Sequence, residues 1–322
     1  MRQVRLGQTD LQVSAIALGT WAFGGDWGVA DVDDARQSIR HALDLGINLF
    51  DTAQGYGFGV AERLLGEALL AGTNRADVFI ATKGGLRMDG DRVVRDASRQ
   101  WLRAGVEDSL RALGTDYIDI YQVHWPDPHT RPEETAEALE ELVREGKIRH
   151  AGVSNYDVVE MRQLGRFGRV ETLQPPYHMF RREIEETILP HTVEHDMGVL
   201  VYGPMAHGLL SGRMTDSTTF DSDDWRSKSS DFTGETLRKN VAVVERLKGL
   251  ADEMDLSLPQ LAVAWTLAHP AVQVAIVGAH RAAQLDETAS AGDVELSTTD
   301  LKQIETILTD AVPLRGPRPE GM

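Results

Sequence analysis

The sequence predicts an α/β fold, a single (β/α)8 TIM barrel, from two observations. Eight short apolar segments alternate with segments of helical character along most of the 322 residues. These apolar segments contain few polar residues, as expected for parallel strands that helices cover. The rival fold is a doubly wound open sheet, but no Gly-x-Gly-x-x-Gly motif follows the first strand. We therefore expect residues 1–322 to form one barrel domain.

The expected strands begin with an N-terminal β-hairpin that precedes the barrel. Residues 4–6 and 11–13 are strand-like and flank the turn Gly7-Gln-Thr-Asp10. Each of the next eight strands is short, apolar and followed by helical sequence. They are expected at residues 15–19, 47–51, 78–83, 117–124, 148–153, 170–174, 198–202 and 272–278.

The expected helices follow the strands. In residues 31–45, for example, Ala35, Ile39 and Ala42 fall on one face of a helix. The barrel helices are expected near residues 31–45, 60–70, 96–113, 133–145, 158–167, 183–195 and 282–291. Extra helices are expected near residues 237–253 and 259–269, between the last two strands, and near 298–309, after the barrel.

Two segments depart from the alternation. Residues 203–235 contain a polar loop after the seventh strand that is longer than ordinary connections. On a barrel rim such a loop is expected to act as a lid or to clamp a cofactor, with disorder as the competing interpretation. The tail from about residue 313 is rich in proline and glycine and is expected to be irregular.

Composition excludes several functional classes. The chain has 33 basic and 50 acidic residues and a net charge of −17, which argues against nonspecific binding to nucleic acid or to anionic membranes. It has no cysteine, so disulfides, thiol nucleophiles and Cys-ligated metals are excluded. We see neither a secretion signal nor an apolar run of membrane-spanning length, and we expect a cytoplasmic protein. A monomer is the default expectation.

Polar residues end otherwise apolar strands, and in a barrel the carboxyl ends of all strands meet at one mouth. One such residue alone is more often a structural cap, but their recurrence at successive strands favours a functional site. A phenol, Tyr56, follows the first of them on a glycine-flanked turn. The strand-end residues are Asp51, Lys83, His124, Ser154 with Asn155, Gln174 and Tyr202.

The chemistry that these groups suggest is carbonyl reduction. Tyrosine has a reference pKa of about 10 and is a fair acid at neutral pH. A Lys83 cation would favour the Tyr56 phenolate and lower that pKa, and Asp51 would hold the lysine. His124 would orient a carbonyl oxygen. No activated nucleophile and no His-x-His or His-Glu-x-x-His metal pattern is found, so we expect no metal and an organic hydride donor.

The sequence resembles the aldo-keto reductases along nearly its whole length, in particular the bacterial branch similar to the potassium-channel β subunits. The motifs that carry the resemblance are specific together, although each is weak alone. They are Phe50-Asp-Thr-Ala-Gln-Gly-Tyr-Gly57, Thr82-Lys83-Gly84, Val123-His124, Gly152-Val-Ser-Asn155 and Tyr202-Gly-Pro-Met-Ala-His-Gly-Leu-Leu-Ser-Gly212, with Gly19-Thr-Trp21 and Gln174-Pro-Pro-Tyr177 typical of the branch. The resemblance implies a barrel enzyme that reduces aldehydes and ketones reversibly with a nicotinamide cofactor.

The resemblance also assigns roles to individual positions. Asp51, Tyr56, Lys83 and His124 match the catalytic tetrad, with Tyr56 as general acid in reduction and general base in oxidation. Ser154, Asn155 and Gln174 match residues that hold the nicotinamide carboxamide, and Tyr202 matches the ring that stacks on it. Further implied cofactor positions are Thr20, Trp21 and Asp51, then Gly203, Pro204, Met205, Ala206, Gly208, Leu209 and Arg213 at the pyrophosphate, and Gly278, His280, Arg281, Gln284, Glu287 and Thr288 at the adenosine phosphate.

The end of the eighth strand suggests which nicotinamide cofactor is bound. Gly278 ends that strand just before a helix, whose first amides and dipole favour a phosphate. Arg281 adds a permanent cation that suits a 2′-phosphate, and so NADP(H) over NAD(H), although an ordinary solvated arginine is the alternative. Two residues depart from the family pattern: Thr288 stands where asparagine is usual, and His280 is only partly charged at neutral pH.

The substrate is less well defined by the sequence. Trp21, Trp27, Trp125 and Met179, with Trp225 as a further candidate, lie in rim segments and are expected to wall an apolar pocket, unless they are packing anchors. No cluster of arginines is expected at the mouth to hold an anionic substrate. Small aldehydes, ketones or sugar-like carbonyls are the expected substrates.

Two other functions remain open at this point. A nicotinamide-loaded module that reports redox state to a partner would keep the same residues, because channel β subunits also retain the tetrad. A metal-dependent barrel hydrolase is a weaker alternative, with His124 and His129 around a Trp-Pro-Asp-Pro turn as the only candidate ligands.

Overall fold

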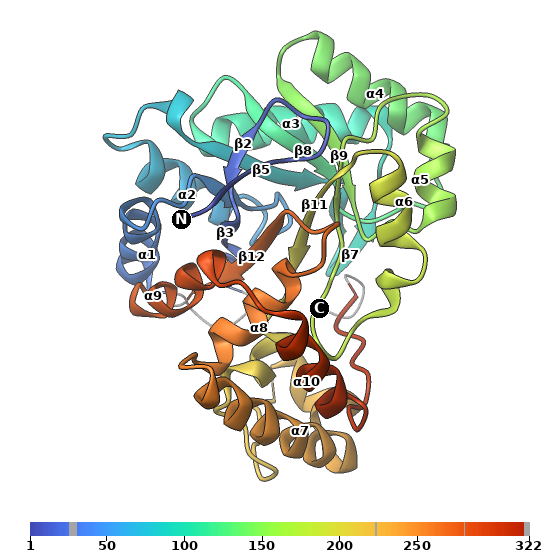
Figure 1. Ribbon diagram of the computed structural model, residues 1–322. Coiled ribbons are helices and arrows are strands. Elements are labelled where there is room, and N and C mark those ends of the chain that lie inside the picture. Colours follow the sequence, from blue (N-terminus) through green and yellow to red (C-terminus); the bar gives the residue numbers. More distant parts are fainter. Residues whose placement is uncertain (26–30, 223, 280, 319–322) are drawn as a thin grey trace.

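The computed structural model describes residues 1–25, 31–222, 224–279 and 281–318. Eight parallel strands close into a barrel in the order β3-β4-β5-β8-β9-β10-β11-β12, with β12 paired to β3. Helices surround the strands (Figure 1), so the (β/α)8 barrel predicted from the alternating pattern is confirmed. The barrel strands are β3 (Ile16–Gly19), β4 (Leu49–Asp51), β5 (Phe79–Gly84), β8 (Ile118–Val123), β9 (Ile148–Ser154), β10 (Thr172–Gln174), β11 (Gly198–Tyr202) and β12 (Val274–Gly278).

The described α-helices follow the strands in the expected order. Seven of them are the expected barrel helices: α1 (Val32–Asp44), α2 (Val60–Leu70), α3 (Arg99–Leu113), α4 (Pro132–Arg144), α5 (Val158–Leu164), α6 (Ile188–Glu194) and α9 (Ala283–Ser290). The extra helices are α7 (Gly234–Glu253) and α8 (Leu258–Leu267), between β11 and β12, and α10 (Thr298–Leu308), after α9. Within the residues that the structure describes, every helix is too short or too polar to span a lipid bilayer.

The N-terminal hairpin closes one end of the barrel. Strands β1 (Gln3–Arg5) and β2 (Gln12–Ser14) pair antiparallel, as predicted, with Val4 opposite Val13. Leu6 and Leu11 of this hairpin are fully buried in one apolar cluster with side chains of six barrel strands. The backbone N–H of Gln8 donates to the carbonyl of Asp196 (2.7 Å), just before β11 begins. The hairpin therefore plugs the amino ends of the strands and leaves the carboxyl ends open.

A second hairpin was not predicted. Strands β6 (Leu86–Asp89) and β7 (Arg92–Arg95) pair antiparallel beyond the end of β5, and Asp89 lies opposite Arg92. The sequence signal was the Asp89-Gly90 pair, because this turn needs a left-handed residue and Gly90 has φ +60°. Because of this hairpin, the following helix begins at Arg99 and not near residue 96 as expected. Ser98 caps the helix by accepting a hydrogen bond from the N–H of Trp101.

Other differences from the expected elements concern helix lengths. The helix expected near residues 158–167 ends at Leu164, before Gly165. The helix expected near residues 183–195 is split into the 3-10 turn η3 (Glu183–Glu185) and α6. The other 3-10 turns are η1 (Trp21–Gly24), η2 (Arg75–Asp77), η4 (Ala206–Ser211), η5 (Trp225–Lys228), η6 (Ser230–Phe232) and η7 (Ala291–Asp293).

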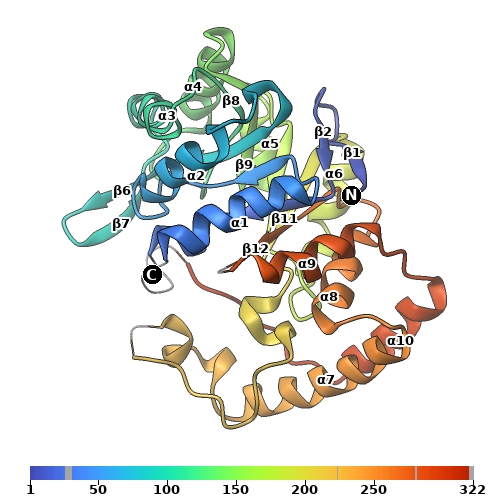
Figure 2. The ribbon, with the colours of Figure 1, turned by 90° about the vertical axis from the view of Figure 1, so that its left-hand side faces the viewer.

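The long segment after β11 is folded against the extra helices in its described part. It contains η4, η5 and η6, and leads into α7, which contacts α8 and α10. Figure 2 shows α7, α8 and α10 gathered on one side of the barrel. Residues 311–318 form neither helix nor strand, but the Leu314 N–H donates to the Phe180 carbonyl (2.8 Å) and the Leu314 side chain is buried. The irregular tail is thus held against the barrel rim.

Candidate active site

The carboxyl ends of the strands surround a cleft of about 370 Å³. Three of the four proposed tetrad side chains line it directly: Asp51, Tyr56 and His124. The predicted convergence of strand-end residues is therefore seen in the structure. The other predicted positions that line the cleft are Trp21, Trp125, Ser154, Asn155, Gln174, Tyr202, Gly203, Pro204, Met205, Gly208, Gly278 and Gln284.

Lys83 lies beneath the cleft and links the acid to the phenol. Its Nζ donates to Asp51 Oδ1 (2.7 Å) and to the carbonyl of Thr52 (2.8 Å), and lies 3.3 Å from the hydroxyl of Tyr56. Only 1% of the lysine side chain is exposed. Asp51 and Lys83 end neighbouring parallel strands, β4 and β5, which explains how residues 32 positions apart meet.

Burial opposes the charges of this ion pair, and each partner offsets part of that cost for the other. Desolvation raises the pKa of Asp51 and lowers the pKa of Lys83. The opposing charge and the 2.7 Å hydrogen bond act in the other direction on both groups. Removing either partner would leave an uncompensated buried charge, so the pair is interdependent.

His124 is neutral in this environment. Burial, and secondly the charge of Lys83, lower its pKa well below the usual value. Its ring meets that of Tyr56 edge-on, with centroids 5.8 Å apart. Among the described residues its Nδ1 is buried and has no hydrogen-bond partner. A neutral imidazole whose other nitrogen faces the cleft can donate one hydrogen bond without adding charge.

A row of amide and hydroxyl groups forms the opposite wall of the cleft. Asn155 donates from Nδ2 to the His124 carbonyl (3.0 Å) and to Ser154 Oγ (3.1 Å), and accepts at Oδ1 from the Tyr202 hydroxyl (2.8 Å). Asn155 adopts a left-handed φ of +62°, a conformation that asparagine tolerates better than most residues. These bonds connect the ends of β8, β9 and β11.

Gln174 ties this wall to the ion pair. Its Nε2 donates to Asp51 Oδ2 (2.8 Å) and to Gln122 Oε1 (3.0 Å), and Gln122 in turn donates to Thr172 Oγ1 (3.2 Å). Both oxygens of the Asp51 carboxylate are therefore engaged, one by Lys83 and one by Gln174. The arrangement fixes the orientation of the carboxylate.

The cleft also fits the flat, amide-bearing nicotinamide group. Donors and acceptors of the carboxamide type stand at Ser154, Asn155 and Gln174, beside the Tyr202 ring. At Gly203 and Gly278, which line the cleft, a Cβ would meet no described atom within 4 Å. Backbone left bare in this way allows close approach of a phosphate to the amides.

Some predicted positions lie away from the cleft lining. Thr20, Ala206, Leu209 and Thr288 are buried beneath it, and Glu287 is half-buried on α9. Arg213 and Arg281 are exposed beyond its edge. Met179, expected in the substrate pocket, is instead 2% exposed in the main hydrophobic core, because its segment runs inward under the rim. Trp225 packs against His207 and Phe232, and Trp27 and His280 lie outside the described residues.

No cluster of arginines was expected at the mouth, but the structure brings two arginines there. Arg181 and Arg226 both line the cleft, from segments separated in sequence by the whole of β11 and η4. Arg181 pairs with Glu183 (2.7 Å) and contacts the carbonyl of Arg315, while Arg226 pairs with Asp224.

Other lining residues were also missed. Ala22, His207, Ser211, Ile276 and Pro317 lie on the cleft, and Pro317 belongs to the tail. Burial, with Arg181 and Arg226 nearby, lowers the pKa of His207 to about 3, so this ring is neutral too. No strand-end or helix-start pattern marks Ala22, His207, Ser211 and Pro317, which lie in short 3-10 turns and in the tail, whereas Ile276 lies within β12.

Comparisons with known proteins agree with this geometry. The profile of the Aldo/keto reductase family matches residues 15–309. Aldo-keto reductase YhdN of Bacillus subtilis (strain 168) is 40% identical over 314 residues, which cover 97% of this chain and 95% of that protein. The solved structure of glycerol dehydrogenase AKR11B4 from Gluconobacter oxydans superposes with a TM-score of 0.90 at 38% identity, covering 98% of this chain and 97% of that one.

Two further relatives differ in their described roles. NADH-specific methylglyoxal reductase of Escherichia coli (strain K12) is 34% identical over 93% of this chain and 96% of its own length. A probable voltage-gated potassium channel subunit beta of Arabidopsis thaliana is 31% identical over 96% and 97%, respectively, in line with the predicted resemblance. With the cleft, the polar strand ends and these matches in agreement, the chain belongs to the aldo/keto reductase family, whose members are carbonyl oxidoreductases that use nicotinamide cofactors.

Proposed function

We propose that this protein is an NADP(H)-dependent reductase of aldehydes and ketones that also catalyses the reverse oxidation of alcohols. The observation that carries the proposal is the position of Lys83 Nζ, 2.7 Å from Asp51 and 3.3 Å from the Tyr56 hydroxyl, directly under a cleft. This geometry supports a role for Tyr56 as a proton donor, with the Lys83 ammonium beside it at the site where a carbonyl oxygen would gain charge.

The residues of the chain handle the proton. Tyr56 donates the proton to the carbonyl oxygen of the substrate and becomes a phenolate, which the Lys83 cation beside it stabilises. Asp51 keeps Lys83 in place and balances its charge. In the oxidation direction the same phenolate takes the proton back from the alcohol. When bound, the nicotinamide supplies the hydride to the carbonyl carbon.

His124 orients the substrate in this proposal. Its Nδ1 has no partner among the described residues, and a bare acceptor is less costly to bury than an unpaired N–H. We therefore place the proton of the neutral ring on Nε2, where it can donate to the carbonyl oxygen alongside Tyr56. Ser154, Asn155 and Gln174 would hold the nicotinamide carboxamide, and Tyr202 would pack on its ring.

Replacing Tyr56 with phenylalanine tests the assigned acid. Tyr56→Phe removes one hydroxyl and leaves the ring packed beside Trp21 and His124. We expect kcat to fall by about 100-fold or more, because positioned acid catalysis contributes roughly that factor, while the affinity for NADPH stays the same. The measurement is steady-state reduction of a reactive aldehyde together with fluorescence titration of NADPH. An unchanged kcat would assign the proton donor to another group.

The cofactor preference is proposed from Arg281, which is exposed two residues before α9 begins and three residues after Gly278, the strand end that lines the cleft. An arginine there can hold a 2′-phosphate. A relative is named as NADH-specific, so the preference needs a direct test. We expect Arg281→Gln to weaken NADPH binding by about 10-fold, the value of one charge-assisted hydrogen bond, and to leave NADH binding unchanged.

Fluorescence titration with both nucleotides measures this preference. Arg169→Gln is a suitable control, since Arg169 is exposed before β10 at the amino end of the barrel and pairs with Glu140. Equal weakening of NADPH and NADH in Arg281→Gln would contradict a role in reading the 2′-phosphate. Tighter binding of NADH than NADPH by the parent protein would reverse the proposed preference.

Small carbonyl compounds are the proposed substrates. Trp21 and Trp125 line the cleft, and each presents a flat apolar wall. Relatives are named for methylglyoxal and glycerol, both three-carbon compounds. We propose that this chain also accepts short carbonyls and the corresponding alcohols, and a panel graded by chain length, assayed with the preferred nucleotide, tests this.

We further propose that the chain is one barrel domain and that the rim segment 203–235 acts as the lid of its cleft, because residues of η4 line the cleft.

A redox-sensing module is the second candidate, favoured by the relative named as a channel subunit beta. Such a protein would keep the proton-handling residues but cycle slowly. Stopped-flow oxidation of bound NADPH by an aldehyde separates the two functions. Multiple turnovers at a rate close to the first turnover support the enzyme, whereas one fast turnover followed by very slow nucleotide release supports the sensor.

A further inference from the structure

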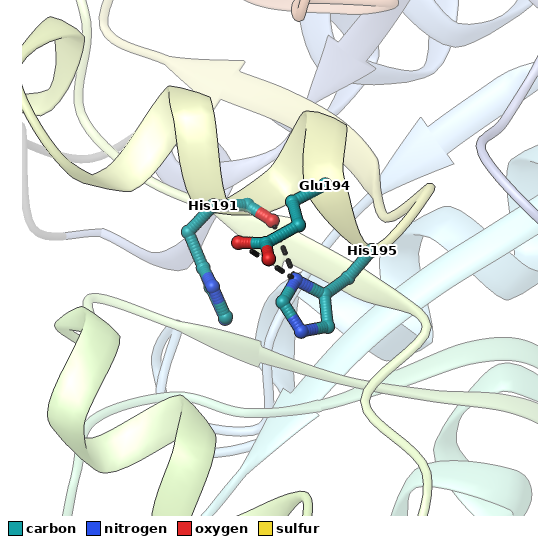
Figure 3. Close-up of side chains that lie close together, drawn as sticks. All are labelled: His191, Glu194 and His195. Carbon is teal, nitrogen blue, oxygen red and sulfur yellow. Dashed lines mark hydrogen bonds and ion pairs between the residues drawn. The ribbon is translucent and has the colours of Figure 1, made fainter.

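A cluster of two histidines and a glutamate lies at the end of α6, outside the cleft. His191, Glu194 and His195 follow a His-x-x-Glu-His spacing, which puts all three on one side of the last helical turn. Each offers a ligand atom, and these atoms lie within 4.8 Å of one another. Figure 3 shows the Glu194 carboxylate between the two imidazole rings.

A hydrogen bond within the cluster sets the tautomer of His195. Its Nδ1 lies 2.9 Å from the backbone carbonyl of His191. A carbonyl can only accept, so Nδ1 carries the proton and Nε2 keeps its lone pair. This ring-to-carbonyl bond is the usual outer-sphere support of a metal-bound histidine. The bond thus sets the tautomer that coordination requires.

His191 supplies an independent indication of a ligand. Its side chain is only 6% exposed, yet its Nδ1 has no hydrogen-bond partner among the described residues. Its ring lies against that of His195, with centroids 4.1 Å apart. A buried, unpartnered nitrogen beside a second imidazole is costly unless something binds it.

The surroundings leave room for an ion and one further ligand. His191 and Glu194 line a surface groove between α5 and α6, so a water molecule can complete the coordination. The side chains of Glu194 and His195 are 68% and 48% exposed and can rotate the short distance needed to reach ligand separations of about 3.3 Å, as in a tetrahedral site. Arg162 lines the same groove and opposes a cation there.

We propose that His191, Glu194 and His195 form a binding site for a divalent transition metal of borderline softness, and that Zn²⁺ is the ion that occupies it. Two imidazole nitrogens and one carboxylate oxygen suit Zn²⁺, Co²⁺, Ni²⁺ and Cu²⁺, whereas Mg²⁺ and Ca²⁺ prefer oxygen ligands. The expectation of no metal site came from searching for His-x-His and His-Glu-x-x-His, and the present spacing is neither of these.

The site lies beside the N-terminal hairpin, which plugs the amino ends of the strands. The cleft lies at the opposite, carboxyl ends. The His195 carbonyl accepts from Gln8 Nε2 (3.5 Å), and the next residue, Asp196, accepts from the Gln8 N–H (2.7 Å). A metal that clamps the end of α6 therefore also fixes the turn against which the N-terminal hairpin packs. We expect Zn²⁺ to stabilise the folded protein by linkage, without a part in the reductase reaction.

Zn²⁺ titration of untagged, EDTA-treated protein by calorimetry tests the site, with Co²⁺ absorption in the visible range as a spectroscopic check. We expect one Zn²⁺ per chain and a rise in Tm on its addition. His195→Ala and Glu194→Gln, both at exposed positions, should weaken Zn²⁺ affinity by about 10-fold or more and abolish the Tm rise. Arg162→Gln should tighten binding, since it removes the opposing cation.

The control is His129→Ala. His129 is an exposed histidine in the loop between β8 and α4, and replacing it should leave Zn²⁺ affinity unchanged. The buried His191 is not needed for the test, so a folding defect cannot obscure it. No Zn²⁺ binding by the parent protein, or affinity that is unchanged in His195→Ala and Glu194→Gln, would overturn the proposal. An equal loss in His129→Ala would place the ion elsewhere and would also overturn it.

Discussion

At the scale of residues, the protein keeps several ionisable side chains neutral or paired in its interior. The Asp51–Lys83 pair holds charge beneath the cleft because each partner offsets the desolvation of the other. His124 and His178 have no such partner, and burial lowers the pKa of each well below the usual value. In the described part of the chain, the interior thus combines a buried ion pair beneath the cleft with buried neutral histidines.

Acid should destabilise the protein through its buried histidines. His178 is 1% exposed and its Nδ1 accepts from the Phe180 N–H (3.2 Å), a bond that protonation of Nδ1 would break. Below pH 6.5 the unfolded chain binds a proton at this ring that the folded chain does not. The free energy of unfolding therefore falls as pH falls, by about 1.4 kcal/mol per pH unit for this group.

His178→Asn should reduce that slope. An asparagine carbonyl can still accept from the N–H two residues ahead, but it does not titrate. Urea unfolding at several pH values between 7 and 5 measures the slope, and His129→Asn, at an exposed position, is the matched control. A slope that is the same in His178→Asn and the parent protein would mean that the acid sensitivity has another source.

At the scale of elements, the strength of the local sequence signal decided which helices and strands could be predicted. Long amphipathic helices such as α1 and α4 were predicted to within two residues, because their caps and periodicity agree. The β6–β7 hairpin was missed, since its strands are short and largely polar and only the Asp89-Gly90 turn marks it. Strand β4 has only three residues, yet the acid at its end, Asp51, identified it.

The N-terminal hairpin gives a test at this scale. Gly7 has φ +51°, and a Cβ there would overlap the Gly198 backbone nitrogen and stand 2.6 Å from the Asp196 carbonyl oxygen. Gly90 in the β6–β7 turn has a similar φ of +60°, but a Cβ there would meet nothing within 4 Å. We expect Gly90→Ala to lower the free energy of unfolding by about 1–2 kcal/mol, which is the cost of the left-handed backbone conformation alone. Gly7→Ala should lower it clearly more, because its Cβ would also clash.

Chemical denaturation of the two variants measures this difference. Gly7→Ala must either move the hairpin away from the start of β11 or strain its turn, so the plug of the barrel loosens. Equal destabilisation by the two substitutions would show that the hairpin can shift without cost and that its close contact with β11 is not a requirement of the fold.

At the scale of the whole molecule, segments far apart in sequence complete the cleft. The tail brings Pro317 to the rim, and the segment after β10 brings Arg181. The tail is anchored to α7 by Asn240, which is fully buried, donates from Nδ2 to the Val312 carbonyl (2.9 Å) and accepts at Oδ1 from the Val312 N–H (2.8 Å). The side-chain amide of Asn240 thus pairs with both backbone groups of Val312, as a neighbouring β-strand would.

Asn240→Ala should release the tail. It leaves the backbone N–H and carbonyl of Val312 without partners, which costs about 1–3 kcal/mol and favours exposure of the tail. Limited proteolysis should then cleave near residue 312 faster than in the parent protein, and the KM for the carbonyl substrate should rise as the rim opens. Asn74→Ala, which removes a cap on the short turn η2, is the control. A tail that remains resistant would mean that Leu314 and Arg315 anchor it sufficiently.

The sequence by itself determined the barrel, the polar residues at its strand ends and the family to which the chain belongs. These depend on local periodicity and on a topology that gathers every strand end at one mouth. Only the tertiary structure decided that Arg181, Arg226 and Pro317 reach the cleft and that Met179 does not. Such positions depend on how irregular loops pack, and no residue pattern of fixed period encodes that packing.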